Sequence, residues 1–461
     1  MREAPGVSQA IAELKALLGS RVETGEAVRA AHANTLTWIE AAPPDAVVWP
    51  LATDEVAAIV EIAGRHRVPL IAFGAGTSLE GQVNAPLGGI SVDLSRMTRI
   101  LAVSARDLDC TVEAGVTRPA LNAHVRDLGL FFAVDPGADG ATLGGMAATR
   151  ASGTNAMRYG TMRDTVLSLK AVMANGAVMT TGGRARKSAA GLDLTRLLVG
   201  SEGTLGIITE LTLKLHPVPE RIVAAACPFE TVAAACEATM DATASGLQLA
   251  RVELLDALQV SAVNAHSKLA LPERPHLFVE IAGGAAATEE ELTQFREIAL
   301  ANGALAFAWA ADETERRRLW RARHDAFWSV RTTWPGRSLV VSDVAVPISA
   351  LATCVAETEA DIAASGLVAP IVGHVGDGNF HVIVVFDAGG RDEGGRVRAF
   401  LDRLVARALA MGGTSTGEHG VGQGKAGHMA REFGGPALEA MRAIKGALDP
   451  LGILNPGKML P

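Results

Sequence analysis

The chain has 461 residues, of which 49% are apolar and only 4% aromatic, which suits two or three globular domains with aliphatic cores. The formal charge is −8, which argues against a nucleic-acid partner because such a partner selects a basic surface. No apolar run approaches the roughly 20 residues of a membrane span, and residues 1–20 contain an amphipathic helix pattern rather than a signal peptide. We therefore expect a cytoplasmic protein.

The numbers and positions of cysteine and glycine residues further limit the class of protein to which the chain can belong. The cysteines are widely spaced, so a disulfide framework, a zinc ribbon and an iron–sulfur cluster are not indicated; they are Cys110, Cys227, Cys236 and Cys354. Glycine is abundant, with 49 residues, but shows no Gly-X-Y period. We expect the glycines to mark tight turns or places where the backbone approaches a ligand.

The first half of the chain alternates strand and helix patterns. The patterns predict strands at 46–50, 68–73, 90–94, 110–114, 166–173, 177–181 and 207–215, and helices at 54–66, capped by Thr53, and 118–128. Asn175-Gly176 predicts a hairpin between the strands that flank it. Pro217 and Pro219 interrupt the pattern, and we place a domain boundary there.

The second half has an α+β pattern that predicts a separate cap, or substrate, domain with an antiparallel sheet. Strands are expected at 222–227, 277–281, 339–346 and 381–386, and helices at 231–245, 288–301, 349–364 and 396–411. The predicted organisation is a first domain at 1–218, the cap domain at 219–430, and a C-terminal segment at 431–461 that returns to the first domain.

Three glycine-rich loops lie in the first domain. The first, Gly74-Ala75-Gly76-Thr77-Ser78, offers consecutive N–H groups and hydroxyls to a phosphate, although a tight turn without ligand fits it equally well. It is not the Rossmann fingerprint, because position 79 is leucine, and no Walker A motif occurs. The other loops span 136–155 and 200–208. Three such loops could wrap a long ligand that carries a pyrophosphate.

With these loops, residues 44–215 resemble the FAD-binding domain of the vanillyl-alcohol-oxidase type. Residues 222–460 resemble the C-terminal domain of FAD-linked oxidases of the D-lactate dehydrogenase and glycolate oxidase D-subunit group. The resemblance implies an α+β fold in which a two-part FAD-binding domain is joined to the cap domain. It also implies that 74–78 bind the FAD pyrophosphate and that 136–155 and 200–208 hold the flavin and adenine ends.

The resemblance implies a set of FAD-binding residues: Gly74, Ala75, Gly76, Thr77, Ser78, Pro136, Gly137, Thr142, Gly145, Ser152, Gly153, Asn155, Glu202, Ile207, Ile208 and Asn455. Some members of the wider family attach the flavin through a histidine in the first loop. This chain has Thr77 and Ser78 there, so we predict that FAD is bound non-covalently.

A pair of histidines marks the second domain. If Asp377-Gly378 forms a two-residue hairpin turn, His374 stands opposite His381 on the same face, with Cβ atoms roughly 5 Å apart. Facing imidazoles are candidate metal ligands, although two hydrogen-bonded histidines beside a turn would give the same pattern. Downstream, Glu418 and His419 add a carboxylate and another imidazole. Two histidines and one carboxylate form a mixed site for Zn²⁺ or Mn²⁺.

The resemblance implies roles for these residues and for an arginine-rich helix. His374, His381 and Glu418 would bind the metal, the two histidines would also contact substrate, and His419 would be the catalytic base. The residues from 316 to 328 predict a helix on which Arg323 and Arg331 share one face. Arg323 matches the family's carboxylate-binding arginine, and Arg331 is a second candidate for substrate binding.

The resemblance therefore implies an FAD-dependent dehydrogenase that oxidises a D-2-hydroxy acid to the 2-keto acid. D-Lactate is the first candidate for this acid. His419 would take the hydroxyl proton while hydride passes, with help from the metal, from C2 to flavin N5. The sequence shows no second redox centre, so the expected electron acceptor is external: a cytochrome, a quinone, an electron-transfer flavoprotein or a partner subunit. Peripheral association with an inner membrane and a homodimer are compatible with the sequence, which leaves the acid, the acceptor, the metal and the oligomeric state open.

Alternatives remain at this stage. A glycolate oxidase D-type subunit or a D-2-hydroxyglutarate dehydrogenase would use the same residues, and the latter would need a cation such as Arg331 or Arg337 for its distal carboxylate. An oxidase that reduces O₂ and a non-catalytic FAD-binding relay or assembly subunit are further readings. Residues 413–417 match the hydrolase pattern G-x-S-x-G, but a helix pattern precedes them where a nucleophile elbow needs a strand.

Overall fold

The computed structural model describes residues 6–33, 37–390 and 392–461, which form two compact units. Unit 1 contains the chain up to Gly153, Gly160–Val218 and Glu418–Pro461, and Unit 2 contains Thr154–Tyr159 and Pro219–Gly417. The chain leaves Unit 1 briefly for Thr154–Tyr159, leaves it again after Val218, at the proline pair, and returns at Glu418, earlier than the expected 431. Among the described residues, no helix is both long enough and apolar enough to cross a membrane.

The smaller sheet of Unit 1 has the strand order β1-β2-β4-β3, and β2, β4 and β3 run parallel. Its strands are β1 (Val22–Glu23), β2 (Ala46–Val48), β3 (Leu70–Phe73) and β4 (Ile90–Asp93). The predicted helix α3 (Thr53–His66) connects β2 to β3, which run parallel on either side of β4 and therefore need a crossover connection. Thr53 is wrong as the cap, because the helix begins at Thr53 itself, after Ala52, without a side-chain cap.

The larger sheet of Unit 1 is antiparallel, with the order β5-β6-β10-β8-β9. Its strands are β5 (Ile100–Ser104), β6 (Asp109–Glu113), β8 (Val166–Val172), β9 (Val178–Gly182) and β10 (Ile207–Lys214). The Asn175-Gly176 hairpin is confirmed, since Val172 pairs with Val178. Aliphatic side chains from both sheets and from α3 form one core, which contains Val48, Ile59, Val92, Val112 and Leu211.

The remaining elements of Unit 1 surround these sheets. They are α1 (Val7–Leu18), α2 (Glu26–Ala31), α4 (Arg118–Val125), β7 (Leu130–Phe131), α5 (Leu143–Thr149), α7 (Met162–Thr165), α8 (Leu194–Leu198), β11 (His216–Pro217) and α16 (Met429–Leu448). The sequence did not predict α16, because Pro436 lies inside it and Gly434 has a non-helical φ of 72°. The helix is therefore two segments joined at a kink.

Unit 2 is built on one antiparallel sheet of eight strands, which confirms the predicted antiparallel cap domain. Its order is β15-β12-β14-β13-β18-β19-β16, and β17 also pairs with β19. The strands are β12 (Arg221–Pro228), β13 (Leu249–Leu255), β14 (His276–Gly283), β15 (Ala308–Ala310), β16 (Ser338–Val341), β17 (Val344–Ala345), β18 (Ile371–Gly373) and β19 (Asn379–Phe386).

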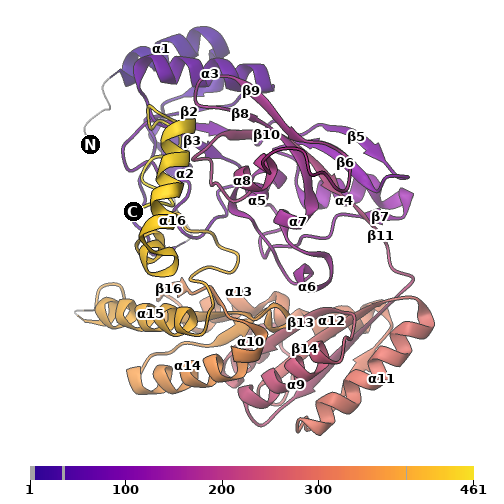
Figure 1. Cartoon of the computed structure of the whole chain (residues 1–461). Helices are drawn as coiled ribbons and strands as arrows, with labels where there is room; N and C mark the ends of the chain where they lie inside the picture. The colour runs from indigo at the N-terminus through magenta and orange to yellow at the C-terminus, as the bar shows by residue number, and fades with distance from the viewer. Residues whose placement is uncertain (1–5, 34–36, 391) are drawn as a thin grey trace. The chain divides into compact units, whose positions relative to one another are not determined.

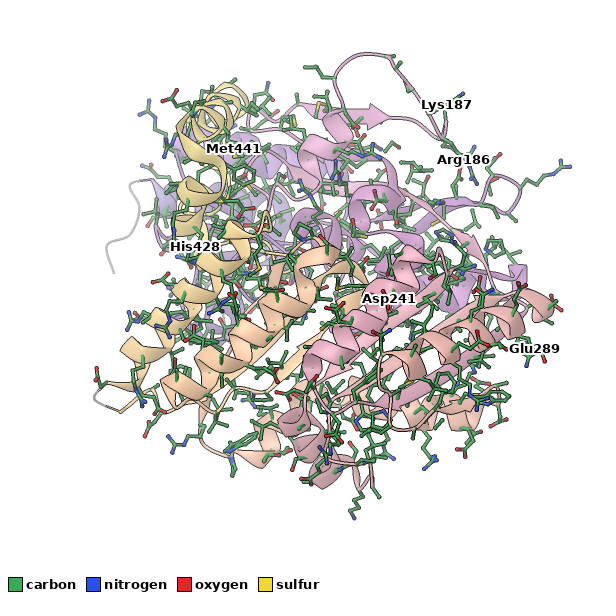
Figure 2. All side chains as sticks on the ribbon, turned by 60° about the horizontal axis from the view of Figure 1, so that its bottom comes forward. Arg186, Lys187, Asp241, Glu289, His428 and Met441 are labelled. Atoms are coloured by element: carbon green, nitrogen blue, oxygen red, sulfur yellow. The ribbon has the colours of Figure 1, made fainter. Side chains whose placement is uncertain are left out.

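Helices cover both faces of this sheet, because side chains along each strand alternate between two cores. On β12, Val223 and Ala225 join the core formed with α9, α11, α14 and α15, while Ala224 and Ala226 join the core formed with α10, α12 and α13 (Figure 1). The helices are α6 (Ala156–Tyr159), α9 (Val232–Ala244), α10 (Ala257–Ser267), α11 (Ala285–Ala301), α12 (Glu313–His324), α13 (Ala326–Thr333), α14 (Leu351–Ser365) and α15 (Glu393–Ala410). The outer sides of α9 and α11 carry exposed charges, such as Asp241 and Glu289 (Figure 2).

Candidate active site

Two buried histidines of Unit 2 face each other where β18 and β19 meet. The ring centroids of His374 and His381 are 5.4 Å apart and the rings are nearly perpendicular. The predicted register is wrong by two residues, because His381 pairs with Val372 and a short 3-10 turn at Val375–Asp377 lengthens the connection. A shift of two residues keeps every side chain on its face of the sheet. The two rings therefore still meet, on the face that α12 and α13 cover.

The hydrogen bonds of these histidines define their tautomers. Nδ1 of His381 lies 3.0 Å from the carbonyl oxygen of Ser342, which can only accept, so Nδ1 carries the proton. Nδ1 of His374 lies 2.7 Å from Oε1 of Glu253 and donates to it in the same way. When either ring is neutral, its lone pair therefore resides on Nε2. This arrangement, in which a backbone oxygen or a carboxylate holds Nδ1, is typical of histidines that bind metals through Nε2.

Glu253 is a site residue that the sequence did not reveal. It lies on β13, is 1% exposed, and its Oε2 accepts a hydrogen bond of 2.5 Å from Nε of Arg323. Burial alone would raise the pKa of Glu253, but the charges and hydrogen bonds of His374 and Arg323 outweigh it and lower the pKa. Glu253 is therefore ionised, and it holds the histidine and the arginine from one side.

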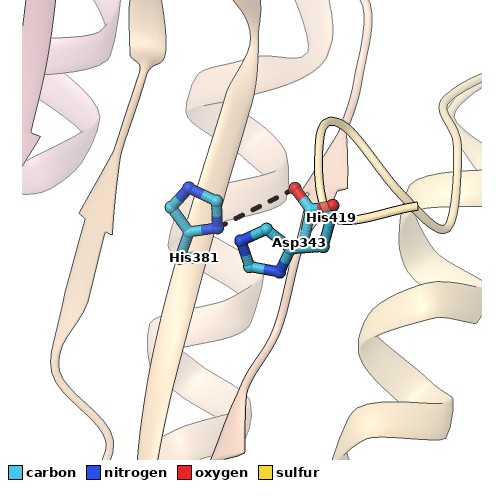
Figure 3. A group of neighbouring side chains, drawn as sticks. All are labelled: Asp343, His381 and His419. Atoms are coloured by element: carbon cyan, nitrogen blue, oxygen red, sulfur yellow. Dashed lines mark ion pairs between the residues drawn. The ribbon is translucent and has the colours of Figure 1, made fainter. Parts of the chain in front are cut away.

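A second carboxylate, Asp343, was also missed. Its side chain is 1% exposed, and Oδ1 lies 3.8 Å from Nδ1 of His381 (Figure 3). Oδ1 accepts a hydrogen bond from Nδ2 of Asn379, and Oδ2 accepts one from Oγ1 of Thr416. His381 has a ligand atom within 4.8 Å of one of Asp343 and also has one within 4.8 Å of one of His374. Nitrogen and oxygen donors at such spacing fit Zn²⁺ or Mn²⁺.

The arginines behave differently from each other. The side chain of Arg323 is only 16% exposed, and its Nη2 lies 3.4 Å from Nε2 of His374, so its guanidinium belongs to this cluster. The predicted single helix is wrong, because it breaks at Asp325 between α12 and α13. The break removes the periodicity that placed Arg331 beside Arg323, and Arg331 is exposed. Arg337 lies 3.8 Å from Asp387 and 3.7 Å from Glu393, so surface carboxylates surround it.

Glu418 and His419 open the last segment of Unit 1. Oε2 of Glu418 accepts a hydrogen bond of 2.8 Å from Oγ of Ser152, and Oε1 lies 3.9 Å from Nε2 of His419. The carbonyl oxygen of His419 accepts a hydrogen bond from Nε2 of Gln82. The residue before Glu418 is Gly417 of Unit 2, where a Cβ would lie 2.9 Å from Oδ1 of Asp343. A peptide bond limits the Cα atoms of Gly417 and Glu418 to about 3.8 Å apart.

The first glycine loop leaves polar groups for a ligand. Among the described residues, no acceptor receives the N–H groups of 75–78. Oγ of Ser78 is buried and, within the same described part, has no hydrogen-bond partner. Buried polar groups are rarely left unsatisfied in a folded protein. The loop therefore fits the phosphates of a nucleotide.

Several residues of the second loop form hydrogen bonds to other parts of the protein. Thr142 caps α5, since its Oγ1 accepts from the N–H of Gly145, and Ser152 binds Glu418. Asn155 falls in Unit 2, where its Oδ1 accepts a hydrogen bond of 2.8 Å from Nε of Arg251. Pro136, Gly137 and Gly153 lie in the irregular chain around α5.

In the third loop, the buried Glu202 carboxylate binds backbone. Its oxygens accept hydrogen bonds from the N–H groups of Val421 and Gly422. Burial raises the pKa of Glu202, and these hydrogen bonds offset only part of that rise. Asn455 donates from Nδ2 to the carbonyl oxygen of Glu202 at 2.7 Å. The neighbouring Ser201 has a buried Oγ that no described residue binds, so it is a better candidate for a ligand contact than Glu202.

Comparison with known proteins identifies the family. Residues 218–459 match the family model for FAD linked oxidases, C-terminal domain, and residues 44–182 match the model for an FAD binding domain. The chain belongs to the FAD-linked oxidase family. It is therefore a flavoprotein oxidoreductase with an FAD-binding domain, as the sequence indicated.

Curated relatives cover nearly the whole chain. A probable mitochondrial D-lactate dehydrogenase from Danio rerio is 46% identical over 98% of this chain and 92% of its own length. The mitochondrial D-lactate dehydrogenase [cytochrome] of Arabidopsis thaliana is 42% identical over 98% of this chain and 80% of its own. The glycolate oxidase subunit GlcD of Bacillus subtilis is 36% identical over 90% of this chain and 89% of its own.

Solved structures establish the fold. p-Cresol methylhydroxylase with bound substrate matches with a TM-score of 0.80 over 98% of this chain and 96% of its own, at 19% identity. 4-Ethylphenol oxidase from Gulosibacter chungangensis matches with a TM-score of 0.79 over 98% and 97%, at 21% identity. The predicted vanillyl-alcohol-oxidase fold is confirmed.

The predicted cytoplasmic location is contradicted, because relatives from Danio rerio, Arabidopsis thaliana and two yeasts are named as mitochondrial proteins. The amphipathic pattern of residues 1–20 carries little information on the compartment. The hydrolase pattern at 413–417 does not form a nucleophile elbow, because the helix α15 precedes it and Ser415 is 1% exposed.

Proposed function

We propose that the protein oxidises a D-2-hydroxy acid, with D-lactate as the first candidate, to the corresponding 2-keto acid. The observation that carries this proposal is the arrangement around Glu253, which holds Arg323 and His374 in one buried cluster with His381. A guanidinium next to paired imidazoles suits a carboxylate that has a hydroxyl on the neighbouring carbon. The relatives named as D-lactate dehydrogenases support the choice of acid.

Two bound groups complete the proposed site. FAD, held non-covalently by the loops at 74–78, 136–155 and 200–208, would supply the acceptor for the hydride on C2. A divalent metal, Zn²⁺ or Mn²⁺, held by His374, His381 and Glu418 would supply a Lewis acid that lowers the pKa of the substrate hydroxyl. The chemistry of the donors fits the metal, and the buried hydroxyls of Ser78 and Ser201 fit FAD.

The chain's own residues then have distinct tasks. Arg323 binds the substrate carboxylate and fixes the direction of the C2–H bond, while Glu253 prevents the guanidinium from rotating away. His419 accepts the hydroxyl proton as general base. Chain connectivity supports this role, because His419 is two residues from Gly417, whose backbone lies against Asp343. Arg331 is assigned no task here, because it is exposed on α13.

The electrons must leave for another molecule. The relatives named as cytochrome-dependent enzymes favour a cytochrome as acceptor, and a quinone or an electron-transfer flavoprotein would serve the same purpose. A glycolate oxidase D-type subunit is the second candidate function, favoured by the similarity to GlcD. A relay subunit without catalysis is less well supported, because such a subunit needs neither a base nor paired imidazoles.

Anaerobic bleaching of the flavin tests the proposal. The purified yellow protein is mixed with D-lactate, L-lactate, glycolate and D-2-hydroxyglutarate, and the absorbance near 450 nm is followed. We expect D-lactate to bleach the flavin fastest and L-lactate to leave it oxidised. His419→Asn should retain FAD but lose bleaching by about 10²- to 10⁴-fold. A flavin that no 2-hydroxy acid bleaches would instead support the relay subunit.

A further inference from the structure

We infer that Glu202 is a positioning residue, which holds the backbone behind His419 and so ties the catalytic base to the FAD-binding loops. We call residues 418–424 the base segment. The inference rests on the proposed role of His419 as base, and it concerns contacts that lie entirely within Unit 1. Glu202 thus binds the protein backbone, in place of the FAD contact that the family resemblance implies.

The contacts of Glu202 are specific. Its Oε1 accepts a hydrogen bond of 2.6 Å from the N–H of Val421, and Oε2 accepts one of 2.8 Å from the N–H of Gly422. Glu202 is 4% exposed, so water does not compete for these bonds. A carboxylate that accepts two successive backbone N–H groups fixes the direction of the chain, and this chain begins two residues after His419.

Gly420 shows how closely the two parts approach. Its φ is +77°, and a Cβ at this position would lie 2.4 Å from Oε1 of Glu202. A side chain there would therefore need a strained backbone and would displace the carboxylate. The glycine between His419 and Val421 is explained by this approach, without a ligand.

The second and third glycine loops, and the residues just after the first, contact the base segment. After the first loop, Gln82 donates to the carbonyl oxygen of His419, and the carbonyl oxygen of Glu80 accepts from the N–H groups of Gln423 and Gly424. In the second loop, Ser152 donates to Glu418. Glu202 is the contact from the third loop. Any ligand that orders these loops should therefore also order the base.

The test uses the FAD-loaded protein with Glu202→Gln. Glutamine keeps the shape of the side chain but presents an NH₂ group to one backbone N–H, so one of the two hydrogen bonds is lost. We expect an unchanged ratio of flavin to protein and an unchanged KM. Amide hydrogen exchange in peptides that cover 419–424 should become at least about tenfold faster. Substrate-driven flavin reduction should slow by about 10- to 100-fold, the usual effect of removing a supporting hydrogen bond at a site.

The matched control is Glu210→Gln. Glu210 also lies in Unit 1, on β10, but it binds Lys170 at 2.7 Å and is not among the contacts of the base segment. Its substitution should leave exchange in 419–424 and the rate of flavin reduction unchanged. If Glu202→Gln folds poorly, Glu202→Asp serves instead, since it keeps the charge, shortens the reach and should show the same faster exchange.

Several outcomes would overturn the inference. Loss of FAD in proportion to activity would make Glu202 a cofactor ligand, and unchanged exchange in 419–424 would show that it does not hold the segment. Exchange is measured without substrate, so it remains decisive if the proposed function fails. In that event His419→Asn would still reduce its flavin quickly, whereas Glu202→Gln would still show faster exchange.

Discussion

Oε1 of Glu253 accepts a hydrogen bond from Nδ1 of His374 at 2.7 Å, across 121 positions of the sequence. The same carboxylate binds Arg323, so a single buried charge orients both a candidate metal ligand and the candidate carboxylate-binding residue. Removing the charge of Glu253 should disturb both partners, because Arg323 would be left buried without its counter-charge and His374 without its acceptor.

Glu253→Gln tests this coupling. The amide can still accept from Nδ1 of His374 through its oxygen, but its NH₂ group then faces Arg323, so the ion pair is lost. We expect KM for D-lactate to rise and the apparent affinity for Zn²⁺ or Mn²⁺ to fall by about 10- to 100-fold. Metal affinity is measured by competition with a chromophoric chelator.

The control for this variant is Glu280→Gln on the neighbouring strand. Glu280 is also buried and faces arginines, with Arg251 3.5 Å away, but it is not part of the His374 cluster. Glu280→Gln should therefore change the stability of the protein more than its affinity for the metal. Equal losses of metal affinity in both variants would mean that Glu253 has no special role.

Metal removal addresses the two histidines directly. Dialysis against a chelator, followed by metal analysis, should leave FAD in place but abolish most of the flavin reduction by D-lactate, and added Zn²⁺ or Mn²⁺ should restore it. His381→Gln should lose the metal without losing FAD, because His381 lies in Unit 2 and the glycine loops at 74–78 and 200–208 lie in Unit 1. Full activity in verified metal-free enzyme would reject the metal's role.

The turn between the two histidines predicts a stability difference between two glycines. Gly378 has φ +74°, and a Cβ there would lie 2.1 Å from the carbonyl oxygen of Val346, whereas Gly336 has φ +78° and open space around it. Gly336→Ala should cost about 1–2 kcal/mol, the penalty of the left-handed backbone alone. Gly378→Ala should cost about 3 kcal/mol or more, because the overlap adds to that penalty.

Thermal unfolding of the two glycine variants provides the measurement. Gly378→Ala should also weaken metal binding, since the turn sets the spacing of His374 and His381. Equal destabilisation of both variants would show that the contact with Val346 relaxes at little cost.

Local sequence patterns predicted the features of the site that depend on one element, and they missed those that depend on contacts between distant elements. The facing histidines were predictable because strand alternation tolerates a register error of two residues. Glu253 was not, because β13 carries no motif and the residue gains its meaning only when three distant elements meet. One continuous helix was predicted in place of α12 and α13, because nothing in the sequence pattern marks the break at Asp325. Glu202 was assigned to FAD because a glycine-rich loop does not distinguish a bound ligand from a bound backbone.

A buried ion pair in Unit 1 predicts how stability depends on pH. Nδ1 of His32 lies 2.8 Å from the carbonyl oxygen of Val28, and Nε2 lies 3.0 Å from Oδ2 of Asp93. Both partners accept, so both nitrogens carry protons and the ring is a cation. Burial lowers the pKa of His32, but the hydrogen bonds that the ring donates to Asp93 and to the carbonyl oxygen of Val28 outweigh it, so the net pKa is raised. Burial raises the pKa of Asp93, but hydrogen bonds from His32 and Ser95 lower it overall.

The signs of these shifts fix the expected pH profile of stability. The stabilisation that His32 gives the folded state is complete below its unfolded pKa of about 6.5, and it is lost as the pH rises through the raised folded pKa. The stabilisation that Asp93 gives is present above its unfolded pKa of about 3.9, and it is lost as the pH falls through the lowered folded pKa. Asp93→Asn should therefore cost about 3 kcal/mol near pH 6, and less as the medium becomes alkaline. Melting temperatures from pH 5 to 9 measure the difference, with Glu13→Gln at the more accessible His66 pair as a control that should change little. Parallel pH profiles for Asp93→Asn and the unmodified protein would show that His32 is not charged in the folded state.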